Sequence, residues 1–127
     1  MNILIESPKS FDQALADLER SVAKHGFSVL HIHPLSETLA AKGHPISMRC
    51  AVLDVCNAVV ASQMLSRDST ISLALPCRVA VFEHAGGTRL GTIAPTTILS
   101  GFGASADVDK TARDVESTLR DILADAV

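Results

Sequence analysis

Two cysteines, and the asparagine beside one of them, are the residues of this chain whose types and positions point most directly to chemistry. Cys56 and Asn57 follow a short apolar run, and Cys77 follows Leu75-Pro76 at the beginning of another. A thiolate is a nucleophile and a ligand for soft metals, whereas an asparagine amide both donates and accepts hydrogen bonds. We therefore predict that Cys56, Asn57 and Cys77 line one ligand-binding site.

The local pattern assigns the two cysteines to different elements. Residues 48–54 are mostly apolar and predict a strand, and Asp54 is a residue type that caps helix N-termini. On this interpretation Val55 and Cys56 begin a helix, whose partial positive charge favours the Cys56 thiolate. The alternative is that Cys56 is a small buried hydrophobic residue, since free cysteines are among the most buried residue types. Cys77 is expected to begin a strand.

Two histidines lie close together in an earlier predicted strand, residues 27–33. His31 and His33 are two positions apart, so strand alternation points their side chains to the same face. The same alternation places Phe27 and Val29 with the histidines. That spacing can place two imidazoles on one metal ion, and it equally suits two exposed histidines on an edge strand.

The thiols and imidazoles together are a donor set for a soft or borderline metal. A closed zinc site usually needs four ligands, and thiolates favour Cu(I) or zinc over magnesium or calcium. We therefore name copper or zinc as the possible ion, with candidate ligands Cys56, Cys77, His31 and His33.

Capping and turn signals divide the rest of the chain into elements. Ser10, with a glutamine three residues later, predicts the start of a helix that ends at Gly26. Ala85-Gly86-Gly87 predicts a hairpin turn, and Ser105 or Asp107 is expected to cap the last helix. The predicted strands are residues 2–6, 27–33, 48–54, 77–84 and 88–94.

This order of elements predicts an α+β fold. It reads strand, helix, strand, short helix, strand, helix, strand, strand, helix. We expect a mixed, mainly antiparallel five-stranded sheet with helices packed on one face. The 127 residues, 47% of them hydrophobic, suit a single domain over residues 1–127 with one aliphatic core.

The composition excludes several classes of function. The net charge is −3, and no block of basic residues supplies the positive field that nucleic-acid binding needs. Aromatic residues make up only 3% of the chain, which leaves few rings for stacking on bases. No apolar run reaches the roughly 20 residues that span a bilayer, and no secretory signal begins the sequence. We therefore expect a cytoplasmic protein with reduced thiols and neither nucleic-acid nor membrane partners.

The central stretch also carries a recognisable pattern. Cys56-Asn57 precedes an Ala/Val-rich helix, Asp68 lies in an acidic turn, and Leu75-Pro76-Cys77 leads into a Val-rich strand. This pattern resembles the bacterial and archaeal family called domain of unknown function 302, and the resemblance extends from about residue 2 to residue 95. Ala58 departs from it, because the family usually has proline there. The resemblance implies a small α+β domain, often a dimer, and supplies no activity.

Three hypotheses from different classes follow. The one we favour is a homodimer that binds a small ligand or a soft metal near Cys56 and Cys77 without catalytic turnover. The dimer is expected from the mean hydropathy of +0.30 and from the partly apolar strand over residues 27–33. The second is a thiol redox or sulfur-carrier protein, in which Cys56 attacks and Cys77 resolves. The third is an interaction or dimerisation domain whose cysteines are structural.

Overall fold

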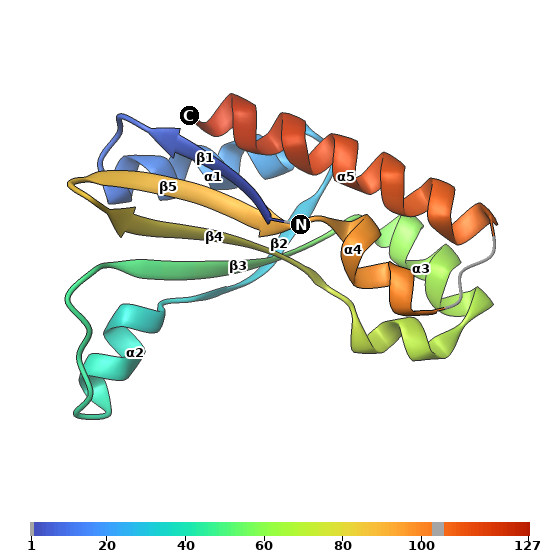
Figure 1. Cartoon of the computed structure of the whole chain (residues 1–127), viewed down its shortest axis with the longest axis horizontal. Helices are drawn as coiled ribbons and strands as arrows, with labels where there is room; N and C mark the ends of the chain where they lie inside the picture. The colour runs from blue at the N-terminus through green and yellow to red at the C-terminus, as the bar shows by residue number, and fades with distance from the viewer. Residues whose placement is uncertain (1, 103–105) are drawn as a thin grey trace.

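A computed structural model describes residues 2–102 and 106–127, and its centre is a twisted five-stranded sheet (Figure 1). The order of strands in the sheet is β1-β5-β4-β3-β2, and each of the four neighbouring pairs is antiparallel. The predicted α+β class and the predicted order of elements are confirmed, with a sheet that is wholly antiparallel. The strands are β1 (Asn2–Ser7), β2 (Ser28–His33), β3 (Cys50–Cys56), β4 (Cys77–His84) and β5 (Gly87–Ile93).

The helices divide into a pair that covers the sheet and a group beyond its end. Helices α1 and α5 lie side by side over one face, whereas α3 and α4 lie past the end of the strands (Figure 1). None of the helices in the described part of the chain is long and apolar enough to cross a membrane. The bounds are α1 (Phe11–Lys24), α2 (Leu35–Ala41), α3 (Ala58–Arg67), α4 (Pro95–Leu99) and α5 (Ala106–Ala126), with short 3-10 segments η1 (Ser69–Leu73) and η2 (Ser100–Phe102).

Most of the local capping and turn signals act as predicted. The Ser10 hydroxyl accepts a hydrogen bond from the Gln13 backbone N–H at 3.2 Å and so caps α1. Gly26, just past α1, has a φ of 80°, a left-handed conformation that favours glycine. At the last helix, Asp107 lies inside the first turn of α5 rather than at its cap, and Ser105 lies outside the described residues.

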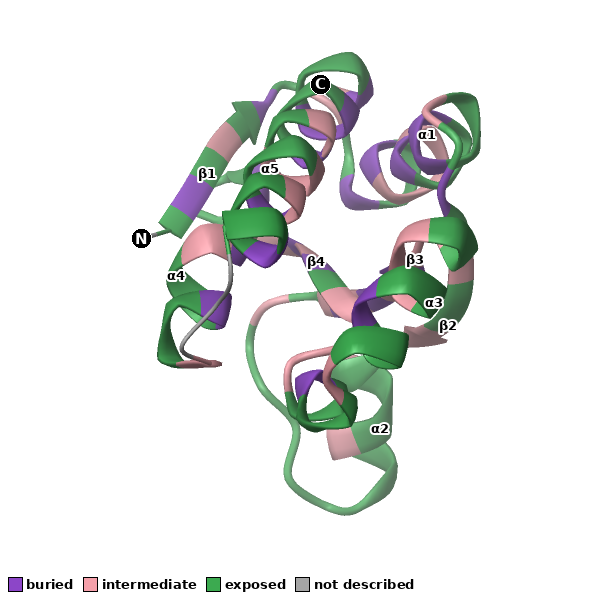
Figure 2. Cartoon of the chain, turned by 90° about the vertical axis from the view of Figure 1, so that its right-hand side faces the viewer, coloured by how far each residue is buried: buried purple, intermediate pink, exposed green. Residues whose placement is uncertain are grey.

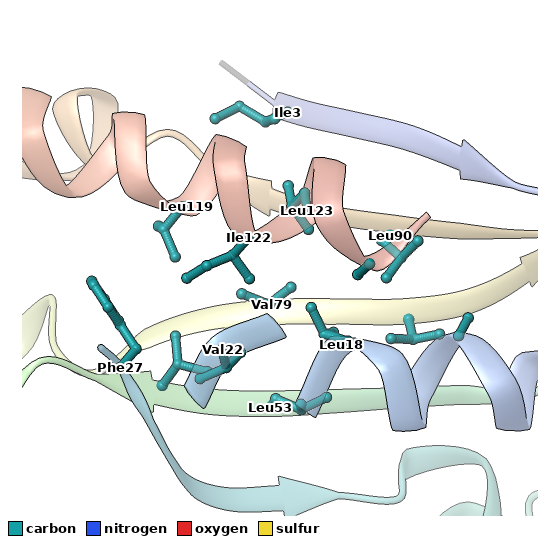
Figure 3. Packing of buried hydrophobic residues seen from close by; sticks show 14 of the residues in the cluster. Ile3, Leu18, Val22, Phe27, Leu53, Val79, Leu90, Leu119, Ile122 and Leu123 are labelled. Atoms are coloured by element: carbon teal, nitrogen blue, oxygen red, sulfur yellow. The ribbon is translucent and has the colours of Figure 1, made fainter. Parts of the chain in front are cut away.

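The sheet core, our name for the larger buried cluster, lies between the sheet and the two covering helices. It takes Leu18 and Val22 from α1 and Ile122 from α5, and these pack on Leu53 and Val79 of the central strands (Figure 3). These helix positions recur every three or four residues, which places them on one face of each helix. In β3 the buried residues alternate with partly exposed ones, so one face of the strand faces the helices.

A second, smaller cluster of buried residues lies beyond the end of the sheet, and we call it the end core. Figure 2 views the molecule from this end and shows buried residues on the inner sides of the helices, whereas α2 has no buried residue. The N-terminal half of α5 packs in the end core, and its C-terminal half packs in the sheet core. A single helix therefore joins the two clusters. The end core consists of Met64, Ile71, Leu99, Val108 and Ala112.

The face of the sheet opposite α1 and α5 carries a groove whose lining is mostly apolar but includes the exposed guanidinium group of Arg78. It has a volume of about 660 Å³ and crosses the four strands β1, β5, β4 and β3. Leu4 and Ile93 in this groove are each about half exposed. Its lining side chains on the sheet include Leu4, Val52, Ala80, Phe82 and Ile93.

Candidate functional site

A cavity of about 270 Å³ lies where the sheet core meets the end core. Val55 and Cys77 are paired across β3 and β4 and contribute the sheet side of its wall. Met64 of α3 and Leu99 of α4 contribute the opposite side. The chain leaves the sheet after Cys56 into α3 and returns through η1 to Cys77, and residues of both segments line the cavity.

The structure brings the three residues predicted to bind a ligand to this one cavity. Cys56, Asn57 and Cys77 all line it. Because Val55 is paired with Cys77 and Cys56 directly follows Val55, the backbones of the two cysteines are close neighbours. Cys50, the remaining cysteine, lies at the other end of β3, where its backbone N–H donates to the Ser36 hydroxyl.

The predicted helix start was wrong by several residues. Strand β3 continues to Cys56, and Asn57 rather than Asp54 is the N-cap of α3. The Asn57 side-chain oxygen accepts a hydrogen bond from the Val60 backbone N–H at 3.2 Å. Asp54 and Asn57 are both good capping residues, and the pairing of Val55 with Cys77 keeps the strand intact between them. Cys56 therefore ends a strand and does not lie in the first helical turn, which was the basis for predicting a stabilised thiolate there.

One face of α3 forms the side of the cavity next to Cys56. Asn57, Val60, Ala61 and Met64 all line the cavity, and their spacing of three or four residues is that of a helix face. Asn57 therefore has two roles, because the same side chain that caps the helix borders the cavity. Its amide oxygen is engaged by the helix, so its N–H groups are what it can offer to an occupant.

Burial sets the charge state of Cys77. It raises the pKa of the Cys77 thiol to about 11, and the nearby Cys56 contributes a smaller increase. The physical cause is that an apolar environment disfavours the charged thiolate. At neutral pH Cys77 is therefore a neutral thiol in the wall of the cavity.

The rest of the wall is almost entirely apolar. Among the described residues that line the cavity, none carries a charge. Leu30 and Leu65 line it and are 58% and 36% exposed, so they mark the side on which the cavity opens to solvent. Such a space suits an apolar occupant, because a charged group placed there would lose its hydration without gaining a partner.

The two predicted histidine ligands lie apart from this cavity. Neither His31 nor His33 lines it, and their rings contact each other edge to face with centroids 4.4 Å apart. His33 Nε2 lies 2.7 Å from Asp54 Oδ2, and Arg78 Nε lies 3.9 Å from the other oxygen of that carboxylate. Within residues 2–102 and 106–127, no group of three or more His, Cys, Asp or Glu side chains could hold a metal. The structure thus does not gather Cys56, Cys77, His31 and His33 into one metal centre.

A β-bulge in β2 determines which side chains lie on the same face of the strand as the histidines. The register of β2 on β3 shifts between Val29 and His31, which leaves Leu30 as the extra residue. Val29 and Ile32 consequently both pack against the sheet core. The prediction that Phe27 and Val29 share the histidine face was wrong, because the bulge reverses the alternation within the strand.

Several lining residues were not identified as site residues from the sequence. In the sequence, Met64 and Val115 are apolar residues at helical spacing, a pattern that indicates core packing rather than a site. Leu99 lies in a short segment without a strong pattern. What assigns these three residues to the cavity is the packing of α3, α4 and α5 at the end of the sheet.

Comparisons with known proteins give a consistent picture of the fold. The family model described as "Domain of unknown function DUF302" matches residues 3–126. A crystal structure of an uncharacterized conserved DUF302 protein from Bacillus stearothermophilus superposes with a TM-score of 0.94 at 25% identity, covering 99% of this chain and 98% of that one. No curated protein matches the chain.

The state of Cys77 leads to a testable pH dependence. In a Cys50→Ser, Cys56→Ser variant Cys77 is the only thiol left, and its alkylation by iodoacetamide reports the fraction of thiolate. Burial is the larger cause of the raised Cys77 pKa, and it persists when Cys56 is replaced. The alkylation rate of the folded variant should therefore still rise with pH beyond about pH 9, whereas the rate of a thiol with an ordinary pKa of ~8.5 would begin to level off there. The same variant unfolded in urea is the control, and its rate should level off first. Identical pH profiles in the two states would contradict the assignment.

Proposed function

The chain belongs to the family described as domain of unknown function DUF302, and from the geometry of its cavity we propose that it binds a small apolar molecule without chemical turnover. The observation that supports this proposal is the cavity of about 270 Å³ at the junction of the two cores, with an uncharged wall that includes Cys56, Asn57 and Cys77. Ligand sites in proteins are typically apolar spaces with a few placed polar groups, and this cavity fits that description.

The size of the cavity limits the ligand. A cavity of roughly 150 Å³ lined by aliphatic and aromatic side chains holds benzene, so a space of about 270 Å³ accommodates a molecule of on the order of ten non-hydrogen atoms. A longer molecule would extend past Leu30 and Leu65 toward solvent.

The polar groups of the wall suggest how such a ligand is oriented. The Asn57 N–H groups can donate to a carbonyl or hydroxyl oxygen of the ligand, and the neutral Cys77 thiol is a weak donor. These contacts favour a molecule that is mostly apolar with one neutral acceptor. A carboxylate or ammonium group is disfavoured, because no opposite charge lines the cavity among the described residues.

Thiol redox chemistry is the second candidate, supported by the presence of both cysteines in one cavity. The state of Cys77 argues against it as the main function. A resolving thiol attacks as the thiolate, and burial raises the pKa of Cys77 to about 11, so few of these thiols are ionised near neutral pH. Binding makes no such demand, since a neutral thiol packs well against an apolar ligand.

Filling the cavity tests the binding proposal. Ala61 lines the cavity, so Ala61→Leu adds three carbon atoms to the wall and should weaken binding of toluene or cyclohexanol about tenfold or more. Binding is measured by amide chemical-shift titration, with saturable shifts expected near residues 55–61 and 75–77. Ala40→Leu is the matched control, because Ala40 is exposed in the unrelated helix α2, and it should bind as the parent does.

Equal affinities in the two variants, or no saturable shifts in the parent, would remove the proposal. The circular dichroism spectrum of Ala61→Leu should match that of the parent, so that lost binding can be attributed to the filled space.

We further propose that two copies of the chain associate through the open face of the sheet. The apolar groove across β1, β5, β4 and β3 supports this, since exposed apolar patches of this kind often mark interfaces. Leu75 and Pro76 line both this groove and the cavity, so the dimer interface would adjoin the binding site.

A cytoplasmic location remains a prediction, and it fits cysteines that stay reduced.

A charge placed in the groove tests the dimer. The parent is expected to have twice the mass of the chain by light scattering at low micromolar concentration, and Ile93→Lys should reduce it to the monomer mass. The reason is that an unpaired ammonium is costly to bury in an apolar interface. Val59→Lys is the control, because Val59 is an exposed apolar residue of α3 that does not line the groove. A monomeric parent, or equal effects of both lysines, would end this proposal.

A further inference from the structure

Three sulfur-bearing residues from three different elements meet at the wall of the cavity. Cys56 ends β3, Cys77 begins β4, and Met64 lies on α3. The chain has three cysteines and three methionines, so half of its sulfur atoms belong to residues of this one wall. Cys50 and Met48 do not line it.

The backbone geometry holds these residues close to one another. Val55 is the cross-strand partner of Cys77 and directly precedes Cys56, so the backbones of the two cysteines are neighbours. Strand alternation gives Cys77 the same face as Val55, and Cys56, at the end of β3, lines the same cavity. Met64 is buried, and it belongs to the helix face that begins at Asn57, directly after Cys56.

We propose that Cys56, Cys77 and Met64 form a binding site for Cu(I) at the wall of the cavity. The chemical type of the three ligand atoms, all sulfur, indicates which metal ion the site would bind. Thiolate and thioether sulfurs are the ligands that select Cu(I), whereas calcium and magnesium need oxygen ligands, and no carboxylate lines the cavity among the described residues. Structural zinc needs four ligands drawn from Cys, His and carboxylates, and the described residues contain no group of even three of them.

Binding is an exchange of protons for the ion, without oxidation or reduction. Each thiol loses its proton to solvent as its sulfur binds Cu(I), and both the copper and the sulfurs keep their oxidation states. The thioether of Met64 donates without losing a proton. Two protons are therefore released per ion, so the affinity for Cu(I) should rise as the pH rises. The site uses the same cavity as the proposed apolar ligand but does not depend on that ligand.

Competition with a chromogenic Cu(I) chelator tests the site in the reduced full chain under anaerobic conditions. Cys56→Ser and Cys77→Ser should each lower the Cu(I) affinity on the order of a hundredfold, and Met64→Leu about tenfold, because each removes one donor. Cys50→Ser and Met48→Leu are the matched controls and should leave the affinity unchanged. Cu(I) binding that survives both cavity cysteine variants, or that Cys50→Ser weakens as much, would overturn the site.

Met64→Leu also separates this inference from the proposed binding of an apolar molecule. Leucine keeps the wall apolar and nearly conserves the volume, so the variant should still bind toluene while its Cu(I) affinity falls. Unchanged Cu(I) affinity in a Met64→Leu variant that is folded by circular dichroism would remove Met64 from the site. A parent protein that binds Cu(I) but does not bind toluene would count against the apolar ligand and leave the Cu(I) site standing.

Discussion

The packing of helix α5 against two separate clusters is the constraint on which the rest of the structure depends. At 21 residues, and about 1.5 Å per residue, this helix is roughly 30 Å long and extends past the sheet that its C-terminal half covers. Its N-terminal half, through Val108 and Ala112, supports the end core, and Leu119 and Ile122 belong to the sheet core. Because one rigid helix fixes the spacing of the two clusters, the space between them cannot collapse easily.

That space determines which chemistry the cysteines can support. Val55 and Cys77 are the last residue pair of β3 and β4, and Asn57 caps the helix that follows. All three residues line the cavity, and none of the described lining residues carries a charge. Burial keeps the Cys77 thiol neutral, which favours binding over turnover. A soft ion is the partner that would change this state, because it takes the place of the thiol protons. The cavity wall can thus hold a neutral molecule while its thiols are protonated, or a thiophilic ion that displaces their protons.

Much of the fold could be predicted from the sequence, because its signals are local. Ser10, Gly26 and the glycines after Ala85 each mark an end or a turn by a backbone preference that needs no distant partner. The strand at Cys77 was predicted with its observed bounds, since proline cannot continue the segment before it.

The errors occurred where distant contacts decide between local alternatives. Both Asp54 and Asn57 can cap a helix, and only the register of β3 on β4 selects Asn57. The bulge at Leu30 has no marker in the sequence, yet it turns Val29 away from the histidines and into the core. The cavity itself is built from residues between Phe27 and Val115, so no window of sequence contains it.

Xenon binding would test whether the junction of the two cores holds a preformed apolar cavity, because xenon enters such cavities and its use requires no knowledge of the natural ligand. In a crystal of the chain held under xenon pressure, we expect anomalous density between Val60, Met64 and Cys77. Ordered water filling that space, or side chains closed over it with no xenon bound, would show that the junction is not a preformed apolar cavity.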